Sequence, residues 1–240
     1  MTDRDTGFAE QFARCLQEAE REFGDDAALR PSCLARAARD VLPVAGVGLG
    51  LARDGEQIPL GASDGVAALA ERLQYTLGDG PGWESTRNGQ PLAADHEAIH
   101  RRWSVFADQL FARTPYRAVL SLPLPAFPDR LFGADLYLTD ETALATVPFA
   151  DVATTMELLV AGLRPASDTD LLASPAAAAR HTVWVAAGMT MGRHALDGRD
   201  ALDLLRAHSI AHDLVLDELA RRIVAREIDV PALEEAVDGD

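Results

Sequence analysis

Two pairs of histidines have the spacing in this chain that most resembles a metal site. His208 and His212 lie four residues apart, as do His96 and His100. On a helix, this spacing can direct two imidazoles at one ion. Neither pair has a flanking Cys, Glu or third His that would complete a zinc site. We therefore expect surface or capping histidines and no bound metal ion.

A glycine-rich segment, Gly46-Val-Gly-Leu-Gly50, superficially resembles a nucleotide-binding fingerprint. It lacks the glycine at the sixth position and falls inside a predicted strand instead of at a strand-to-helix turn. Small residues in a strand are better explained by a helix that packs closely on it. No Ser-His-Asp or Cys-His motif is recognisable. We therefore expect neither enzyme activity nor a cofactor.

The composition limits the class of partner. All 22 basic residues are Arg, and the net charge of −16 argues against broad attraction to nucleic acid or anionic membranes. Cys15 and Cys33 are predicted to be buried packing groups and not a disulfide. The sequence shows neither a signal peptide nor a run of 18 apolar residues. We expect a cytoplasmic protein whose easier partners are small molecules or proteins.

The elements that position these residues are predicted to alternate between helices and strands up to residue 163. Asp54-Gly55 predicts a hairpin turn, and Ser63 or Asp64 can cap the helix that follows it. Mostly antiparallel strands with helices on their faces define an α+β domain. The remaining predicted helices cover residues 8–23, 31–43, 83–88, 99–112 and 149–163, and the predicted strands cover residues 46–52, 58–62, 91–94, 116–124 and 131–139.

After a predicted linker at residues 164–175, everything is expected to be helical. Asp197 lies where a helix N-cap is needed. The small residues Ala186, Ala187 and Gly188 make the first of these helices thin, which predicts close packing against another helix. The last helix has a buried apolar stripe and two expected ion pairs on its far side: the stripe is Leu216, Leu219, Ala220, Ile223 and Val224, and the pairs are Asp217–Arg221 and Glu218–Arg222.

Residues 30–163 resemble a GAF domain of the actinobacterial kind. The resemblance rests on Tyr75-Thr-Leu-Gly-Asp-Gly-Pro-Gly-Trp83, on Asn88-Gly-Gln-Pro-Leu92 with Asp95 and Trp103, and on the segments 118–124 and 131–137. It implies a central antiparallel sheet with a ligand pocket between the sheet and the helices around residues 64–112. Four aromatic residues could line such a pocket, although bare aromatics are more often simple core: Trp83, Trp103, Phe106 and Phe111.

Residues 176–226 resemble an ANTAR domain, a three-helix module that binds RNA in antitermination regulators. The matching positions are Val183, Ala186, Gly188, Met191, Ala201, Leu205-Arg206, Ser209, Leu216, Leu219-Ala220 and Val224. The sequence departs from the family pattern at Ala187, where a Lys is usual, and at Leu202, where an aromatic residue is frequent. The turn at residues 212–217, often basic in the family, carries no permanent positive charge.

Five arginines are the candidate RNA contacts in this tail. Arg193, Arg199 and Arg206 could share a face, with Arg221 and Arg222 on the third helix. Residues 176–240 contain seven Arg against twelve Asp or Glu, a balance of 7 − 12 = −5. The alternative is that the arginines only pair with neighbouring carboxylates.

The whole chain is therefore predicted to consist of an N-terminal helix at residues 1–29, a sensor domain at 30–163, a linker at 164–175 and an output domain at 176–240. The resemblance implies a signal-responsive antitermination regulator, expected to be a homodimer, that binds a tandem-hairpin RNA leader. The alternative is a sensor whose tail mediates protein interaction or dimerisation.

Overall fold

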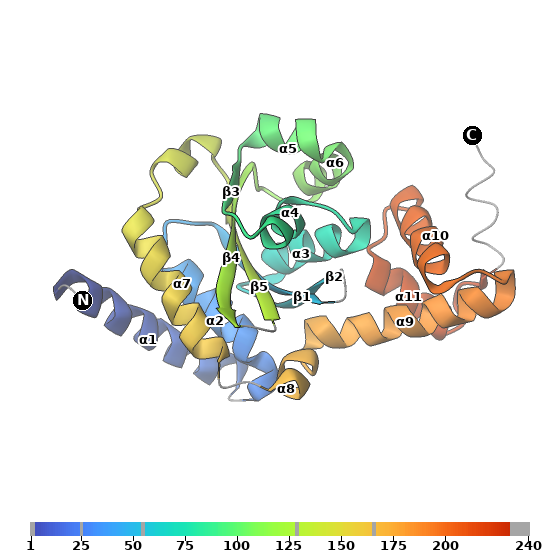
Figure 1. The fold of residues 1–240 in the computed structure, drawn as a ribbon, viewed down its shortest axis with the longest axis horizontal. Helices are drawn as coiled ribbons and strands as arrows, with labels where there is room; N and C mark the ends of the chain where they lie inside the picture. Colours follow the sequence, from blue (N-terminus) through green and yellow to red (C-terminus); the bar gives the residue numbers. More distant parts are fainter. Residues whose placement is uncertain (1–2, 25, 54–55, 128–129, 165–166, 231–240) are drawn as a thin grey trace.

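The fold is built around one antiparallel sheet, seen nearly edge-on in Figure 1. The computed structural model describes residues 3–24, 26–53, 56–127, 130–164 and 167–230. In this part of the chain the sheet has five strands in the order β2-β1-β5-β4-β3. Their bounds are β1 Gly46–Arg53, β2 Glu56–Ala62, β3 Leu92–Ala94, β4 Ala118–Phe127 and β5 Arg130–Leu138. The predicted α+β class is confirmed, and the predicted turn at Asp54-Gly55 lies outside the described residues.

Helices cover both faces of the sheet (Figure 1). On one face, α1 (Asp3–Phe23), α2 (Arg30–Val41) and α7 (Phe149–Leu163) form a core with the apolar residues of β1 and β5. The other face carries α3 (Gly65–Leu77), α4 (Pro81–Asn88), α5 (His96–Arg102) and α6 (Ser104–Arg113). The N-terminal helix α1 thus packs on α2 and α7 of its own chain.

The small residues of β1 let α3 approach the sheet closely, as predicted. A Cβ added at Gly48 would collide with the Glu71 side chain on α3, and one at Gly46 would collide with the Tyr116 hydroxyl. Asp64 is the N-cap of α3, because its carboxylate accepts hydrogen bonds from the N–H groups of Val66 and Ala67.

One sequence prediction on element boundaries is wrong. The helix expected at residues 99–112 is two helices, because Trp103 adopts a non-helical conformation (φ −137°, ψ 65°) while its ring is buried in the core. The segment expected to be a linker, residues 164–175, contains a helix, α8 (Asp168–Leu172), that starts with a capping box at Ser167. Leu171 from α8 is fully buried in the core that α2 also forms.

The last part of the chain is helical, as predicted. The long helix α9 (Pro175–His194) runs away from the sheet towards the right of Figure 1. The helices α10 (Gly198–Ala211) and α11 (Leu216–Val224) pack on it. Asp197 caps α10 as expected, with its carboxylate accepting from the N–H groups of Arg199 and Asp200. The start of α9 also covers β2, the edge strand of the sheet. Below, "the tail" means α9, α10 and α11.

None of the described helices is long and apolar enough to cross a lipid bilayer.

Candidate ligand site and its connection to the tail

A buried polar network lies between α3 and the middle of the sheet. The Gln74 amide donates to Asp135 (2.6 Å) and to the Tyr137 hydroxyl (3.0 Å), and that hydroxyl donates to Glu71 (2.7 Å). All four side chains are buried. Sequence reasoning did not single out Glu71 or Gln74, because each looks like an ordinary polar residue of an amphipathic helix.

Two carboxyl groups in this network cannot both be charged at low cost. Burial, and then the neighbouring Asp135, hold the pKa of Glu71 well above its usual range. Burial also raises the pKa of Asp135, partly offset by its hydrogen bonds, including the one from Gln74. The pair therefore keeps a proton at a pH where exposed carboxyls have lost theirs.

The glycine-rich turn that carried the family resemblance closes over this network. Gly78 and Gly80 have positive φ values of 65° and 145°, which glycine adopts without strain. The N–H of Gly82 donates to the side-chain amide oxygen (Oε1) of Gln74 at 2.9 Å. A Cβ at Gly82 would collide with the Asp135 carboxylate. The turn is thus required for α4 to lie directly on the buried carboxyl pair.

Next to the network, a cavity of about 280 Å³ opens between α4 and the β1–β2 end of the sheet. Gln57 and Trp83 line it together with Ala52, Arg53, Glu56, Arg87 and Leu131. In the described part of the chain, the side-chain amide oxygen of Gln57 and the indole N–H of Trp83 are buried without a hydrogen-bond partner. Such orphaned groups are costly unless something satisfies them.

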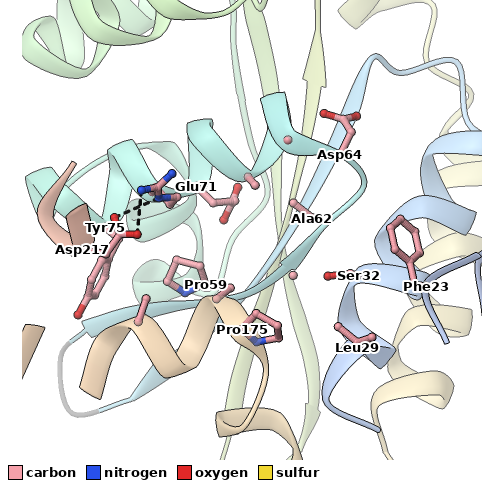
Figure 2. Close-up of a pocket in the computed structure, with 16 residues that line it drawn as sticks. Phe23, Leu29, Ser32, Pro59, Ala62, Asp64, Glu71, Tyr75, Pro175 and Asp217 are labelled. Carbon is pink, nitrogen blue, oxygen red and sulfur yellow. Dashed lines mark hydrogen bonds and ion pairs between the residues drawn. The ribbon is translucent and has the colours of Figure 1, made fainter. Parts of the chain in front are cut away.

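A larger groove of about 570 Å³ lies where the sheet meets the tail (Figure 2). Its walls come from α2, α3 and the first turns of α9, and β2 contributes Pro59 and Gly61. Tyr75 and Asp217 lie at one end in Figure 2, and Phe23 and Leu29 lie at the other. Asp217 is ion-paired with Arg72, which also lines the groove. Both the sheet and the tail therefore form this groove.

The four aromatic candidates do not line one pocket. Trp83 lines the small cavity. Trp103 and Phe106 are buried core residues between the sheet and α5 and α6. Phe111 stacks on His96 with 4.2 Å between ring centroids. Of the four, Trp83 lines the cavity described above, and the polar Gln57 beside it gave no signal in the sequence.

The five candidate arginines lie in different surroundings. Arg193 is exposed on α9. Arg199 lies 4.0 Å from Asp203. Arg221 lies between Glu218 (2.8 Å) and Glu227 (3.0 Å), and Arg222 lies 3.9 Å from Glu227. The predicted pairs Asp217–Arg221 and Glu218–Arg222 are not formed. Asp217 pairs with Arg72 on α3 instead, and Glu218 pairs with Arg221.

Arg206 is separated from the other arginines by its contact with the sheet domain. Its side chain is only 17% exposed, and it bonds to Asp203 at 3.3 Å. Its guanidinium packs against Gly78 at the end of α3, where a Cβ would stand 2.9 Å from its central carbon. Arg206 therefore belongs to the junction between sheet and tail in this conformation.

In the described part of the chain, neither histidine pair belongs to a larger group of potential metal ligands. His208 is buried and stacks on His212 with 3.9 Å between ring centroids, and burial lowers the pKa of His208. His100 lies 3.7 Å from Asp108. Within the described ranges, no group of three or more His, Cys, Asp or Glu side chains could hold a metal ion. Cys15 and Cys33 are free thiols, the first half-buried and the second buried.

The helix α3 connects the buried network to the tail. On one side it carries Glu71 and Gln74 of the network. On the other, Arg72 pairs with Asp217 at 2.8 Å, and the Leu216 N–H donates to the Thr76 hydroxyl at 2.9 Å. Tyr75 is buried in the core of the tail. The helix α3 thus contacts both the buried network and α11.

No family model matches the chain, and no curated protein matches it significantly. Among solved structures, it is similar to the GAF domain from a phosphoenolpyruvate-protein phosphotransferase from Coxiella burnetii, with 16% identity and a TM-score of 0.45. The match covers 65% of this chain and 95% of that chain. The fold class given above rests on the strand order and helix layers of this chain itself.

Proposed function

We propose that this chain is a non-enzymatic, signal-responsive regulator. The sheet domain, residues 30–163, binds a small-molecule signal, and the helical unit at residues 176–240 is the output that binds a structured RNA. The resemblance of the sequence to GAF and ANTAR domains supports this division. A homodimer in the cytoplasm is the expected form.

The observation that carries the proposal is the double role of α3. Glu71, Arg72, Gln74, Tyr75 and Thr76 occupy consecutive turns of one helix, with some in the buried network and the others against the tail. A ligand that alters the sheet face under α3 therefore has a short mechanical path to the output.

The position of Arg206 indicates how a signal would act. In the described conformation its guanidinium packs on Gly78, and its side chain is only 17% exposed. If Arg206 contacts RNA phosphates, the tail has to move away from α3 first. The signal would then act by weakening this contact, and Arg72→Ala, which removes the ion pair to Asp217, should raise RNA affinity without any ligand.

The test is a mobility shift of an RNA leader with two successive hairpins by the full chain. Binding should weaken as salt rises, because phosphate contacts release counterions. Arg221→Ala/Arg222→Ala should weaken binding and reduce the slope of log K against log salt by about two, roughly one for each lost contact. The matched control is Arg14→Ala/Arg101→Ala, which removes the same charge from exposed positions on α1 and α5.

Equal effects of the two double variants would show that Arg221 and Arg222 are structural. This outcome would favour a second candidate function, in which the tail mediates protein interaction or dimerisation. Two observations support this candidate. The carboxylates described above flank four of the five arginines. In addition, α9 exposes Trp184, Val185 and Met191, and such side chains are frequent in protein interfaces.

A further inference from the structure

We propose that the cavity beside Gln57 and Trp83 binds a small carboxylate, about the size of an amino acid, that carries an amide-like group at its other end. The amide would meet Gln57 and Trp83, and the carboxylate would meet Arg87. This proposal names a ligand class for the proposed sensor domain. Only the effect of binding on the tail rests on the proposed function.

The orphaned polar atoms define the inner end of the site. Gln57 is 5% exposed, and its carbonyl oxygen lacks a partner in the described part of the chain, as does the indole N–H of Trp83. One group accepts a hydrogen bond and the other donates one. A ligand with adjacent N–H and C=O groups satisfies both at once. If the Gln57 amide is turned over, it donates instead, and the ligand carbonyl still has two donors.

Two glycines leave the space that Gln57 needs to hold this position. A Cβ at Gly82 would lie 2.8 Å from the Gln57 amide nitrogen, and one at Gly50 would lie 3.1 Å from it. The amide therefore sits in a recess formed by β1 and α4, beside a cavity whose volume of about 280 Å³ suits a small metabolite.

The charges at the cavity favour an anion. Arg87 brings a guanidinium group to its lining, and the carboxylate there, Glu56, is bonded to Arg180 of α9 at 2.8 Å. Arg87 therefore offers positive charge at this cavity in a chain with a net charge of −16. Arginine binds carboxylates through paired, charge-assisted hydrogen bonds. The Glu56–Arg180 pair also joins the cavity wall directly to the tail.

The test uses pyroglutamate, a ring amide with a carboxylate, and the isotope-labelled full chain. The three tryptophans give three indole N–H signals, and Trp83→Phe identifies that of Trp83. Pyroglutamate should move the Trp83 signal saturably. 2-Pyrrolidone, which lacks the carboxylate, and cyclopentanecarboxylate, which lacks the amide, should each bind about tenfold or more weakly. Arg87→Ala should weaken pyroglutamate binding by a similar factor, and Arg101→Ala, on exposed α5, should not change it.

The proposal is overturned if the Trp83 signal does not respond to pyroglutamate up to about 10 mM, or if the two partial compounds bind as well as the complete one. Gln57→Leu offers an independent check, because it should abolish the response while preserving the other two indole signals, which report an intact fold. A Trp83 response in a chain that never binds RNA would keep this inference and reject the RNA-binding function. RNA binding without a Trp83 response would reject this inference and keep the RNA-binding function.

Discussion

At the scale of single residues, the most consequential feature is the buried carboxyl pair of Glu71 and Asp135, both with a raised pKa. Both lie under the glycine-rich turn, and Tyr137 and Gln74 orient their carboxyl groups. A buried carboxyl with a raised pKa stabilises the fold while it stays protonated. The same interaction makes the sheet face under α3 sensitive to anything that changes its protonation.

The first prediction concerns Glu71→Gln. Because the pKa of Glu71 is raised in the folded state, its contribution to stability is complete below its unfolded pKa and is lost as pH rises through the folded pKa. The wild-type chain should therefore lose stability towards alkaline pH, and Glu71→Gln should lose less, since the amide keeps a bond to Tyr137 without ionising. Urea unfolding at a series of pH values measures this. Glu157→Gln, on an exposed part of α7, should leave the pH profile unchanged.

At the scale of elements, the long helix α9 follows the sequence expectation in part. Ala186 and Ala187, predicted to permit close packing, are buried with Val183 in the core shared with α10 and α11. Gly188 was predicted to do the same, yet a Cβ there, or at Gly192, meets no described atom within 4 Å. The glycines therefore lie on the outward side of α9, near the exposed Trp184.

The second prediction follows from this open position. Gly188→Ala should stabilise the chain by about 0.5–1 kcal/mol, because alanine has the higher helix propensity and no atom is displaced. The contrasting control is Gly82→Ala, also in a helix, where the added Cβ collides with Asp135 and should destabilise the fold. Thermal unfolding of both variants measures the two effects. A loss of self-association in Gly188→Ala, seen by ultracentrifugation, would instead assign this face to a second copy of the chain.

At the scale of the whole molecule, the sheet domain and the tail exchange side chains across their junction. Tyr75 of α3 is buried in the core of the tail, and Val215, just before α11, is buried in the core between the sheet and α3. Arg180 and Glu56 add a further link between α9 and β2. The two parts therefore have separate cores joined by a few specific contacts, which suits a signal that changes their relative position.

The third prediction tests this junction. Val215→Asp places a charge where a fully apolar contact is needed, which is strongly unfavourable without a partner. The tail should detach from α3, so that the radius of gyration from small-angle scattering rises while the circular dichroism of the helices is largely kept. Val224→Asp, at a partly exposed position of α11, is the matched control and should leave the radius unchanged. A collapse of all secondary structure in Val215→Asp would contradict the separate cores.

The sequence by itself determined the local elements. Caps such as Asp64 and Asp197 and apolar periodicities act over a few residues, so their outcome can be inferred from neighbours along the chain. The tertiary structure alone decided which distant side chains meet: Glu71 with Asp135, Arg206 with Gly78, and Asp217 with Arg72 instead of Arg221. These contacts depend on strand register and on how helices settle on the sheet. A polar residue on a helix therefore has the same local pattern whether it faces water or a buried partner.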